Sequence, residues 1–212
     1  MEFLENSLES IRNYDGKGAA SWAKKAMDEG VDPLVALDAV SGVMKKIGDL
    51  FGSGELWLPD LIGAAEASQA GLAVIEEKIV ESGEEPQRVG NVVIGTVFGD
   101  IHNIGKTMVA ALLTASGFGV IDLGTNVPAE KFTEAVKENE PDILAMSALL
   151  TTTSVEQGKV IEALEEAGLR DKVKVMVGGG AITAEFAKQI GADRYGATAP
   201  EAVGLAMSLL GK

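Results

Sequence analysis

One histidine and a neighbouring carboxylate are the residues of this 212-residue chain with the clearest chemical potential. His102 is the only histidine, and it follows Asp100 by two residues in the segment GDIHNIG. A carboxylate that hydrogen-bonds one imidazole nitrogen fixes the tautomer and makes the other nitrogen a better metal ligand. The pair therefore suggests a metal-binding imidazole, although a lone histidine can also be purely structural.

The sequence offers this imidazole no companions for a conventional metal site. There is no cysteine, which excludes disulfides, cysteine-bound zinc, iron–sulfur clusters and thiol catalysis. The other carboxylates do not cluster near the histidine segment, whereas a protein metal site needs three or four converging ligands. A metal at His102 would therefore have to arrive inside a macrocycle that supplies its remaining ligands.

Glycines in the same segment raise the alternative of a phosphate site at a helix N-terminus. The spacing matches neither a P-loop nor a Gly-x-Gly-x-x-Gly fingerprint, and Lys106-Thr107 alone is a weak signal. A phosphoryl-accepting receiver domain would need an aspartate and a lysine where Ser147 and Tyr195 stand. The residues therefore favour neither kind of phosphate chemistry.

The residues from position 89 onward are predicted to form a doubly wound α/β domain that brings the candidate loops together. Short apolar runs alternate with helical segments in five βα units, the runs beginning near positions 92, 120, 143, 174 and 192. This pattern predicts a flavodoxin- or Rossmann-like five-stranded parallel sheet with strand order 2-1-3-4-5. Ligands of such sheets bind beyond the carboxyl ends of the strands, where the loops at His102, Ser147 and Gly178-Gly179 should meet.

The first 88 residues are predicted to form a separate four-helix bundle. Helical periods extend to about residue 13 and over 17–29, 33–51 and 58–81. The polar segment 82–90 carries Gly and Pro and predicts an interdomain linker. We therefore expect a helical domain over residues 1–88 and an α/β domain over residues 89–212.

Charge and hydropathy restrict the partners that we expect. The chain has 18 basic and 32 acidic residues, a formal net charge of −14, which disfavours nucleic acid and anionic membranes. It has no signal-peptide pattern and no apolar run of about 18 residues. These features predict a cytoplasmic protein whose partners are small molecules and other proteins.

The order and spacing of the loop residues resemble the signature of cobalamin-binding domains. Asp100 to Gly105 match Asp-x-His-x-x-Gly, Ser147 to Leu149 match Ser-x-Leu after 41 residues, and Gly178-Gly179 follow after 28 more. The segments IGDLF (47–51) and ELWLPDL (55–61) are similar to the helical cap of methionine synthase and of small methyltransferase corrinoid proteins. The segment SALLTTT (147–153) resembles the methylamine and betaine branch of the latter.

This resemblance implies a cobalamin cofactor bound base-off and His-on, in its methylcobalamin form. His102 would be the lower axial cobalt ligand through Nε2, with Nδ1 facing Asp100 and Asp100 reaching Ser147, so these three form the expected catalytic group. The other expected cofactor contacts are Ile101, Gly105, Leu149, Thr151, Gly178 and Gly179, together with Phe51 and Leu58 shielding the upper face.

The implied function is that of a methyl carrier. Co(I) would accept a methyl group from a substrate-specific methyltransferase, and methyl-Co(III) would be presented to a second methyltransferase acting on coenzyme M or tetrahydrofolate, with a reductive activase as a candidate further partner. The alternatives are a cobalamin-dependent regulator or photoreceptor, which the acidic charge disfavours, and the cobalamin subunit of a mutase, which commonly lacks the cap. The methyl donor stays open among methylamines, betaines, methanol and aryl methyl ethers.

Overall fold

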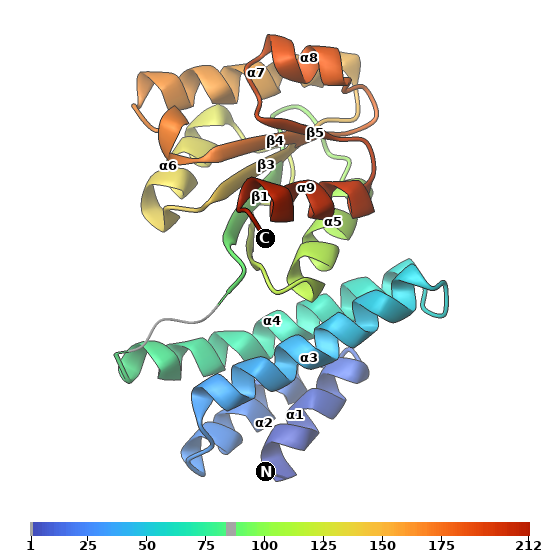
Figure 1. Ribbon diagram of the computed structural model, residues 1–212, viewed down its shortest axis with the longest axis vertical. Helices are drawn as coiled ribbons and strands as arrows, with labels where there is room; N and C mark the ends of the chain where they lie inside the picture. The colour runs from blue at the N-terminus through green and yellow to red at the C-terminus, as the bar shows by residue number, and fades with distance from the viewer. Residues whose placement is uncertain (1, 84–87) are drawn as a thin grey trace. The chain divides into compact units, whose positions relative to one another are not determined.

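The computed structural model describes residues 2–83 and 88–212 of the chain (Figure 1). The chain divides into two compact units, one formed by residues 1–88 with 114–117 and the other by the remaining residues from Val89 onward. Positions 84–87 of the predicted linker lie outside the described residues.

The first unit is helical and has the four helices predicted from the sequence. They are α1 (Glu2–Arg12), α2 (Gly16–Asp28), α3 (Pro33–Gly52) and α4 (Leu58–Glu81). Each begins and ends within about one residue of its predicted bounds, because local signals mark the ends. Asp32, for example, accepts a hydrogen bond from Leu34 N at 2.9 Å and so caps α3.

The turn between α3 and α4 is anchored by Asp60. Its Oδ2 accepts a hydrogen bond from Trp57 N at 2.8 Å, and its Oδ1 accepts one from the Tyr14 hydroxyl at 3.0 Å. The Trp57 side chain itself is 78% exposed. Asp60 therefore fixes the start of α4 and ties it to the residues that follow α1.

The second unit alternates strands and helices along the chain. Its elements are β1 (Asn91–Thr96), α5 (Ile104–Ala115), β2 (Gly119–Asp122), α6 (Ala129–Asn139), β3 (Ile143–Ser147), α7 (Thr151–Glu166), a 3₁₀ turn (Arg170–Lys172), β4 (Lys174–Gly178), α8 (Ala184–Gln189), β5 (Arg194–Gly196) and α9 (Ala199–Leu209). All strand pairs are parallel, in the order β2-β1-β3-β4-β5. The predicted fold class and strand order are confirmed.

Helices cover both faces of the sheet (Figure 1). The core on one face joins the sheet to α6, α7 and α8 and includes the fully buried Phe132, Leu144 and Leu164, while the core on the other joins it to α5 and α9 through Leu113 and Ala206. Apolar contact on both faces explains why the strands read as short continuous apolar runs. Among the described residues no helix is both long and apolar enough to cross a membrane.

Candidate functional site

The register of the sheet places the ends of three strands in one row. Thr96 of β1 pairs with Ser147 of β3, and Ser147 pairs with Gly178 of β4. The three loops that carry the predicted site residues therefore leave the sheet side by side. This is the edge at which ligands of doubly wound sheets bind.

His102 and Asp100 form a hydrogen-bonded pair in the loop after β1. His102 Nδ1 lies 2.7 Å from Asp100 Oδ1, which also accepts a hydrogen bond from the His102 backbone N at 3.0 Å. Asp100 is fully buried, whereas the imidazole side chain is 48% exposed. The pair therefore holds the ring by Nδ1 and turns Nε2 away from the carboxylate, as a metal-binding imidazole requires.

The second oxygen of Asp100 is bound to the loop after β3. Oδ2 accepts hydrogen bonds from Leu149 N at 2.8 Å and from Thr153 Oγ1 at 2.6 Å. Burial by itself would raise the pKa of Asp100, but the hydrogen bonds, led by that from Thr153, outweigh it and hold the pKa far below its usual range. Asp100 is therefore ionised and accepts a hydrogen bond from His102 Nδ1–H.

The hydroxyl that reaches Asp100 differs from the one expected from the sequence. The prediction that Asp100 reaches Ser147 is wrong, because the hydroxyl that donates to the Asp100 carboxylate is that of Thr153. Ser147 ends β3 on the side of the strand shared with Ile143 and Ala145, whereas Thr153 lies in the first turn of α7, over the buried carboxylate. The run of three threonines at positions 151–153 was the only signal in the sequence for this contact.

A cavity of about 430 Å³ opens beside His102. Six of the predicted site residues line it: His102, Gly105, Ser147, Leu149, Gly178 and Gly179. Its other walls are mainly apolar and come from β1, β3, β4 and α5, with residues 195–199 closing the far side. The cavity is therefore bordered both by the imidazole and by residues at the ends of the strands.

The remaining predicted residues lie outside this cavity lining. Ile101, 76% exposed, precedes the imidazole, and Thr151 is an exposed residue at the start of α7. Phe51 and Leu58 are partly buried and belong to the helical unit, on either side of the turn between α3 and α4.

The signature glycines Gly105, Gly178 and Gly179 differ in how much space surrounds them. A Cβ on Gly179, where φ is +120°, would lie 2.0 Å from the carbonyl oxygen of Ala148, and a Cβ on Gly178 would lie 2.9 Å from that of Gly196. Both positions therefore need glycine because another backbone passes close by. A Cβ on Gly105 meets nothing within 4 Å, so the protein itself does not demand glycine there.

Lys106 also belongs to the site, although its signal in the sequence was weak. Its side chain is only 3% exposed, lines the cavity and forms an ion pair with Asp122 at the end of β2. A buried ammonium needs such a partner. The pair links α5, which follows the His102 loop, to the edge of the sheet.

The surroundings of His102 suit a large, flat, apolar group that brings its own metal ligands. Among the described residues, no three His, Asp or Glu side chains are placed to hold a metal ion. Large apolar side chains on the neighbouring loops and at the start of α5 are instead exposed: Phe98, Ile101, Ile104, Leu149 and Leu150. One oriented imidazole, an apolar rim and an adjoining cavity therefore fit a metallated macrocycle with a tail.

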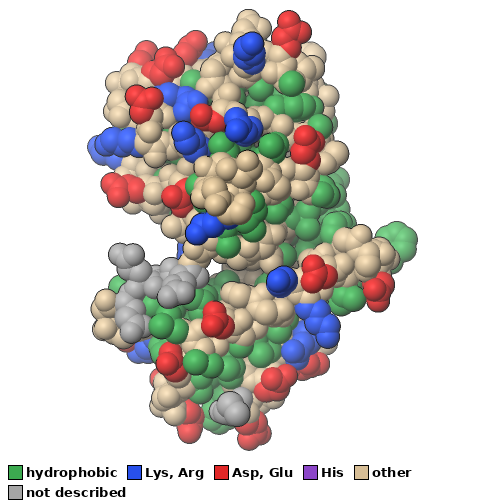
Figure 2. All heavy atoms as spheres, viewed as in Figure 1, with side chains coloured by type: hydrophobic (Ala, Val, Ile, Leu, Met, Phe, Trp, Pro, Cys, Tyr) green, Lys and Arg blue, Asp and Glu red, His purple; other side chains and the backbone are tan. Residues whose placement is uncertain are grey.

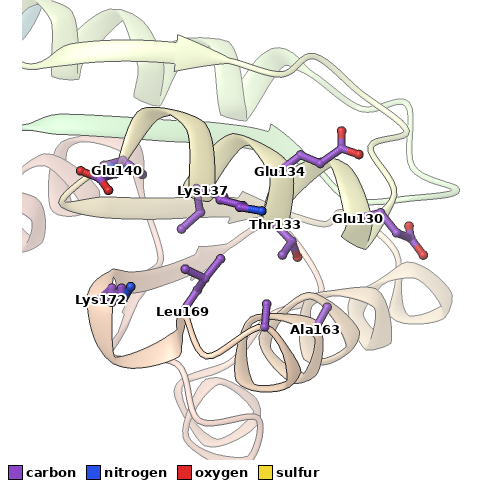
Figure 3. A pocket seen from close by; sticks show the side chains of 11 residues that line it. Glu130, Thr133, Glu134, Lys137, Glu140, Ala163, Leu169 and Lys172 are labelled. Carbon is purple, nitrogen blue, oxygen red and sulfur yellow. The ribbon is translucent and has the colours of Figure 1, made fainter.

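A second hollow lies elsewhere in this unit, between α6, α7 and the 3₁₀ turn (Figure 3). Glu130, Glu134, Lys137 and Lys172 project around it, and Leu169 and Ala163 form part of its apolar lining. It shares no lining residue with the cavity at His102. Its charges are mixed and none of the site residues predicted from the sequence lines it, so it is not the candidate site.

Comparisons with known proteins show which family the chain belongs to. Residues 90–204 match the family model described as the B12 binding domain, and residues 4–76 match a second model with the same description. The chain is 43% identical over 203 residues to the trimethylamine corrinoid protein of Methanosarcina barkeri, covering 95% of this chain and 94% of that protein. It is 44% identical over 216 residues to a corrinoid protein of Desulfitobacterium hafniense, covering 100% and 99%.

A solved structure extends the similarity to the whole fold. One chain of the methanol:cobalamin methyltransferase complex of Methanosarcina barkeri superimposes with a TM-score of 0.82 at 32% identity, covering 99% of this chain and 80% of that one. Fold and site thus define a protein of the B12-binding class. Within that class, the chain belongs to the family of corrinoid proteins of methyltransferase systems.

Proposed function

We propose that this chain is a corrinoid methyl carrier in which His102 binds cobalt. The observation that carries the proposal is the exposed imidazole, held through Nδ1 by the buried Asp100 and placed beside a cavity of about 430 Å³. A cobalt already ligated by a corrin ring needs one further protein ligand, which the single histidine supplies. The cavity beside His102 would then hold the cofactor's own base.

The residues around the site would divide the work of holding the cofactor. His102 Nε2 would bind the cobalt, and the apolar side chains of Ile101 and Leu149 would contact the corrinoid. The cavity past Ser147 and Gly178 would take the nucleotide tail. When bound, the corrinoid supplies a cobalt that accepts a methyl group from one enzyme and yields it to another.

Asp100 and Thr153 would act on the metal only through the imidazole. The carboxylate fixes the tautomer, so that Nε2 presents its lone pair, and Thr153 with Leu149 N keeps the carboxylate ionised and in place. Such an outer partner raises the basicity of a ligating imidazole. Asp100 and Thr153 would therefore affect how strongly His102 binds the cobalt.

The expected partners follow from the relatives. The names of the relatives refer to trimethylamine, dimethylamine and methanol systems, and we infer that this chain receives its methyl group from a substrate-specific methyltransferase of that kind. A second methyltransferase would transfer the group to coenzyme M or tetrahydrofolate, and a reductive activase would restore cobalt that has been oxidised. Phe51 and Leu58 of the helical unit would protect the bound cofactor while no methyltransferase is bound.

Electron paramagnetic resonance of the Co(II) form tests the axial ligand directly. The protein is reconstituted with cobalamin of natural nitrogen isotopes and prepared with and without ¹⁵N labelling. Ligation by His102 predicts a triplet nitrogen splitting that becomes a doublet in the labelled protein. The H102A variant, labelled in the same way, is expected to lose the protein-derived doublet.

Two results would contradict the proposal. A triplet that is unchanged by labelling would mean that the cofactor's own base remains on cobalt. Failure of the folded protein to take up cobalamin at all would remove the function itself. Circular dichroism of each sample separates this second result from simple misfolding.

A further inference from the structure

The segment between β2 and α6 runs beside the His102 loop and contacts it at two adjacent positions. Asn126 Oδ1 accepts a hydrogen bond from Gly99 N at 2.8 Å, and Asn126 N donates one to Asp100 O at 2.9 Å. Asn126 thus binds the backbone N of Gly99 and the backbone O of Asp100, which lie on either side of the peptide bond between these two residues. It therefore uses both its side chain and its backbone to bind the backbone of the loop.

The backbone of Asn126 is adapted to this double contact. Its φ is +56°, in the left-handed region that asparagine tolerates better than most residues. The next residue, Val127, donates its N–H to Thr96 O at 3.0 Å and pairs with Val97 as a parallel bridge. The segment is therefore fixed to the end of β1, and Asn126 projects from it onto the loop.

One of these contacts is made to the backbone of Asp100, the residue whose carboxylate holds the imidazole. Asp100 N donates to Val97 O at 3.2 Å, and Thr96 Oγ1 donates to His102 O at 3.0 Å. The loop is thus held at its start, at its end and, through Asn126, at Gly99 and Asp100. Gly99 has a φ of +77°, and a glycine without this restraint would give the loop considerable freedom.

We propose that Asn126 is a positioning residue that sets the orientation of Asp100 and, through it, of the His102 imidazole. The inference builds on the proposed function in that the oriented imidazole is the cobalt ligand. Asn126 is itself exposed, so its loss should alter the loop far more than the stability of the whole unit. Its action is indirect, because it contacts neither the imidazole nor the cavity.

Three variants separate the side chain from the backbone conformation. N126G keeps the left-handed backbone without strain but removes the oxygen that Gly99 N binds. N126D retains both an acceptor and a residue tolerant of positive φ. E140G is the matched control, because Glu140 is another left-handed residue of the same unit, with a φ of +42°, at the end of α6.

The first readout needs no cofactor. His102 is the only histidine, so its ring gives an unambiguous ¹H–¹⁵N nuclear magnetic resonance signal in the cofactor-free protein at one fixed pH. We expect the hydrogen-bonded Nδ1–H of the wild type to be visible and N126G to broaden or lose it through solvent exchange. N126D and E140G should keep it, with melting temperatures of all three variants close to that of the wild type.

The second readout is cobalamin affinity, measured from the absorbance change on binding. N126G should bind about fivefold more weakly, the factor associated with one ordinary hydrogen bond, and N126D should restore most of the loss. An Nδ1–H signal in N126G identical to that of the wild type would overturn the inference, whatever the affinity. Equal changes in N126G and E140G would overturn it too. If the wild type itself binds no cobalamin, the proposed function fails, while the imidazole signal still decides the role of Asn126.

Discussion

At the scale of single residues, the site depends on how the two oxygens of Asp100 are shared. Oδ1 binds the His102 ring and backbone, and Oδ2 binds Leu149 N and Thr153 Oγ1. A buried carboxylate with four donors stays ionised and keeps one orientation. The orientation of the imidazole therefore depends on Thr153, which is distant in the sequence, as well as on Asp100.

We expect T153V to weaken this arrangement measurably. The variant keeps the shape of the side chain but leaves one bond of a buried carboxylate unmade, which should lower the free energy of unfolding by about 1–3 kcal/mol. Urea unfolding of the cofactor-free protein measures the change. T152V is the control, because Thr152 is exposed in the same turn and its replacement should shift stability by less than about 0.5 kcal/mol. Equal losses in the two variants would contradict the role of Thr153.

The signature glycines give a second prediction at this scale. G105A adds a methyl group where the protein has open space and improves helix propensity, so the cofactor-free protein should be as stable as the wild type or up to about 1 kcal/mol more stable. If the corrin occupies that space, cobalamin affinity should nevertheless fall. Thermal unfolding and absorbance titration measure the two effects.

G179A provides the contrast for this prediction. Its methyl group would clash with the carbonyl of Ala148 in a strained backbone conformation, so the variant should lose about 3 kcal/mol or more of stability even without a cofactor. Unchanged cobalamin affinity in a stable G105A protein would argue against a ring placed over Gly105.

At the scale of elements, the site is assembled by strands ending in register and by helices fastened to the sheet. Thr96, Ser147 and Gly178 lie side by side because β1, β3 and β4 are parallel neighbours. The ion pair of Lys106 with Asp122 joins α5 to β2, next to the loop of His102. The ion pair therefore adds to the apolar packing of α5 and helps to fix this helix beside the cavity.

The two halves of this ion pair should not be equivalent. Lys106 is 3% exposed at its side chain and Asp122 is 34% exposed. D122N would leave a buried ammonium without a counter-charge, at a cost of about 3–5 kcal/mol. K106M would leave a carboxylate that water can reach, at a smaller cost of about 1–2 kcal/mol. Urea unfolding of both variants measures the difference. A larger loss of unfolding free energy in K106M than in D122N would contradict this prediction.

At the scale of the whole molecule, charge restricts the partners. The net charge is −14, and basic side chains are interspersed with acidic ones on the face shown in Figure 2. Nucleic acid binding generally requires a basic surface that displaces counterions from phosphates. The family and the charge therefore agree in pointing to other proteins, and not to DNA, as the macromolecular partners.

This view predicts no retention on double-stranded DNA, even at about 50 mM salt where electrostatic binding is strongest. An electrophoretic mobility shift with the cobalamin-loaded protein, in the dark and after illumination, measures it. A basic DNA-binding protein of similar size serves as the positive control. A salt-dependent shift in either state would favour the cobalamin-dependent regulator over the methyl carrier.

Local patterns in the sequence were enough to establish the order and kind of the elements and the family signature. Apolar periodicity and capping residues are local properties, so all four helices of the first unit and the strand order of the second could be predicted. The loop containing Asp100 and His102 was also evident, because the two residues are neighbours in the chain. Their spacing to Ser147 and Gly178 carried the family resemblance, since loops of one fold have related lengths.

The distant side chains that complete the site could be identified only from the packing of the folded chain. The hydroxyl at Asp100 comes from Thr153 and not from Ser147, because the end of β3 turns Ser147 toward one face of the sheet while the first turn of α7 lies over the carboxylate. The ion pair of Lys106 with Asp122 and the hydrogen bonds of Asn126 could likewise not be predicted from the sequence. Hydrogen bonds between residues far apart in the chain depend on the packing of whole elements, and no local pattern of residue types encodes them.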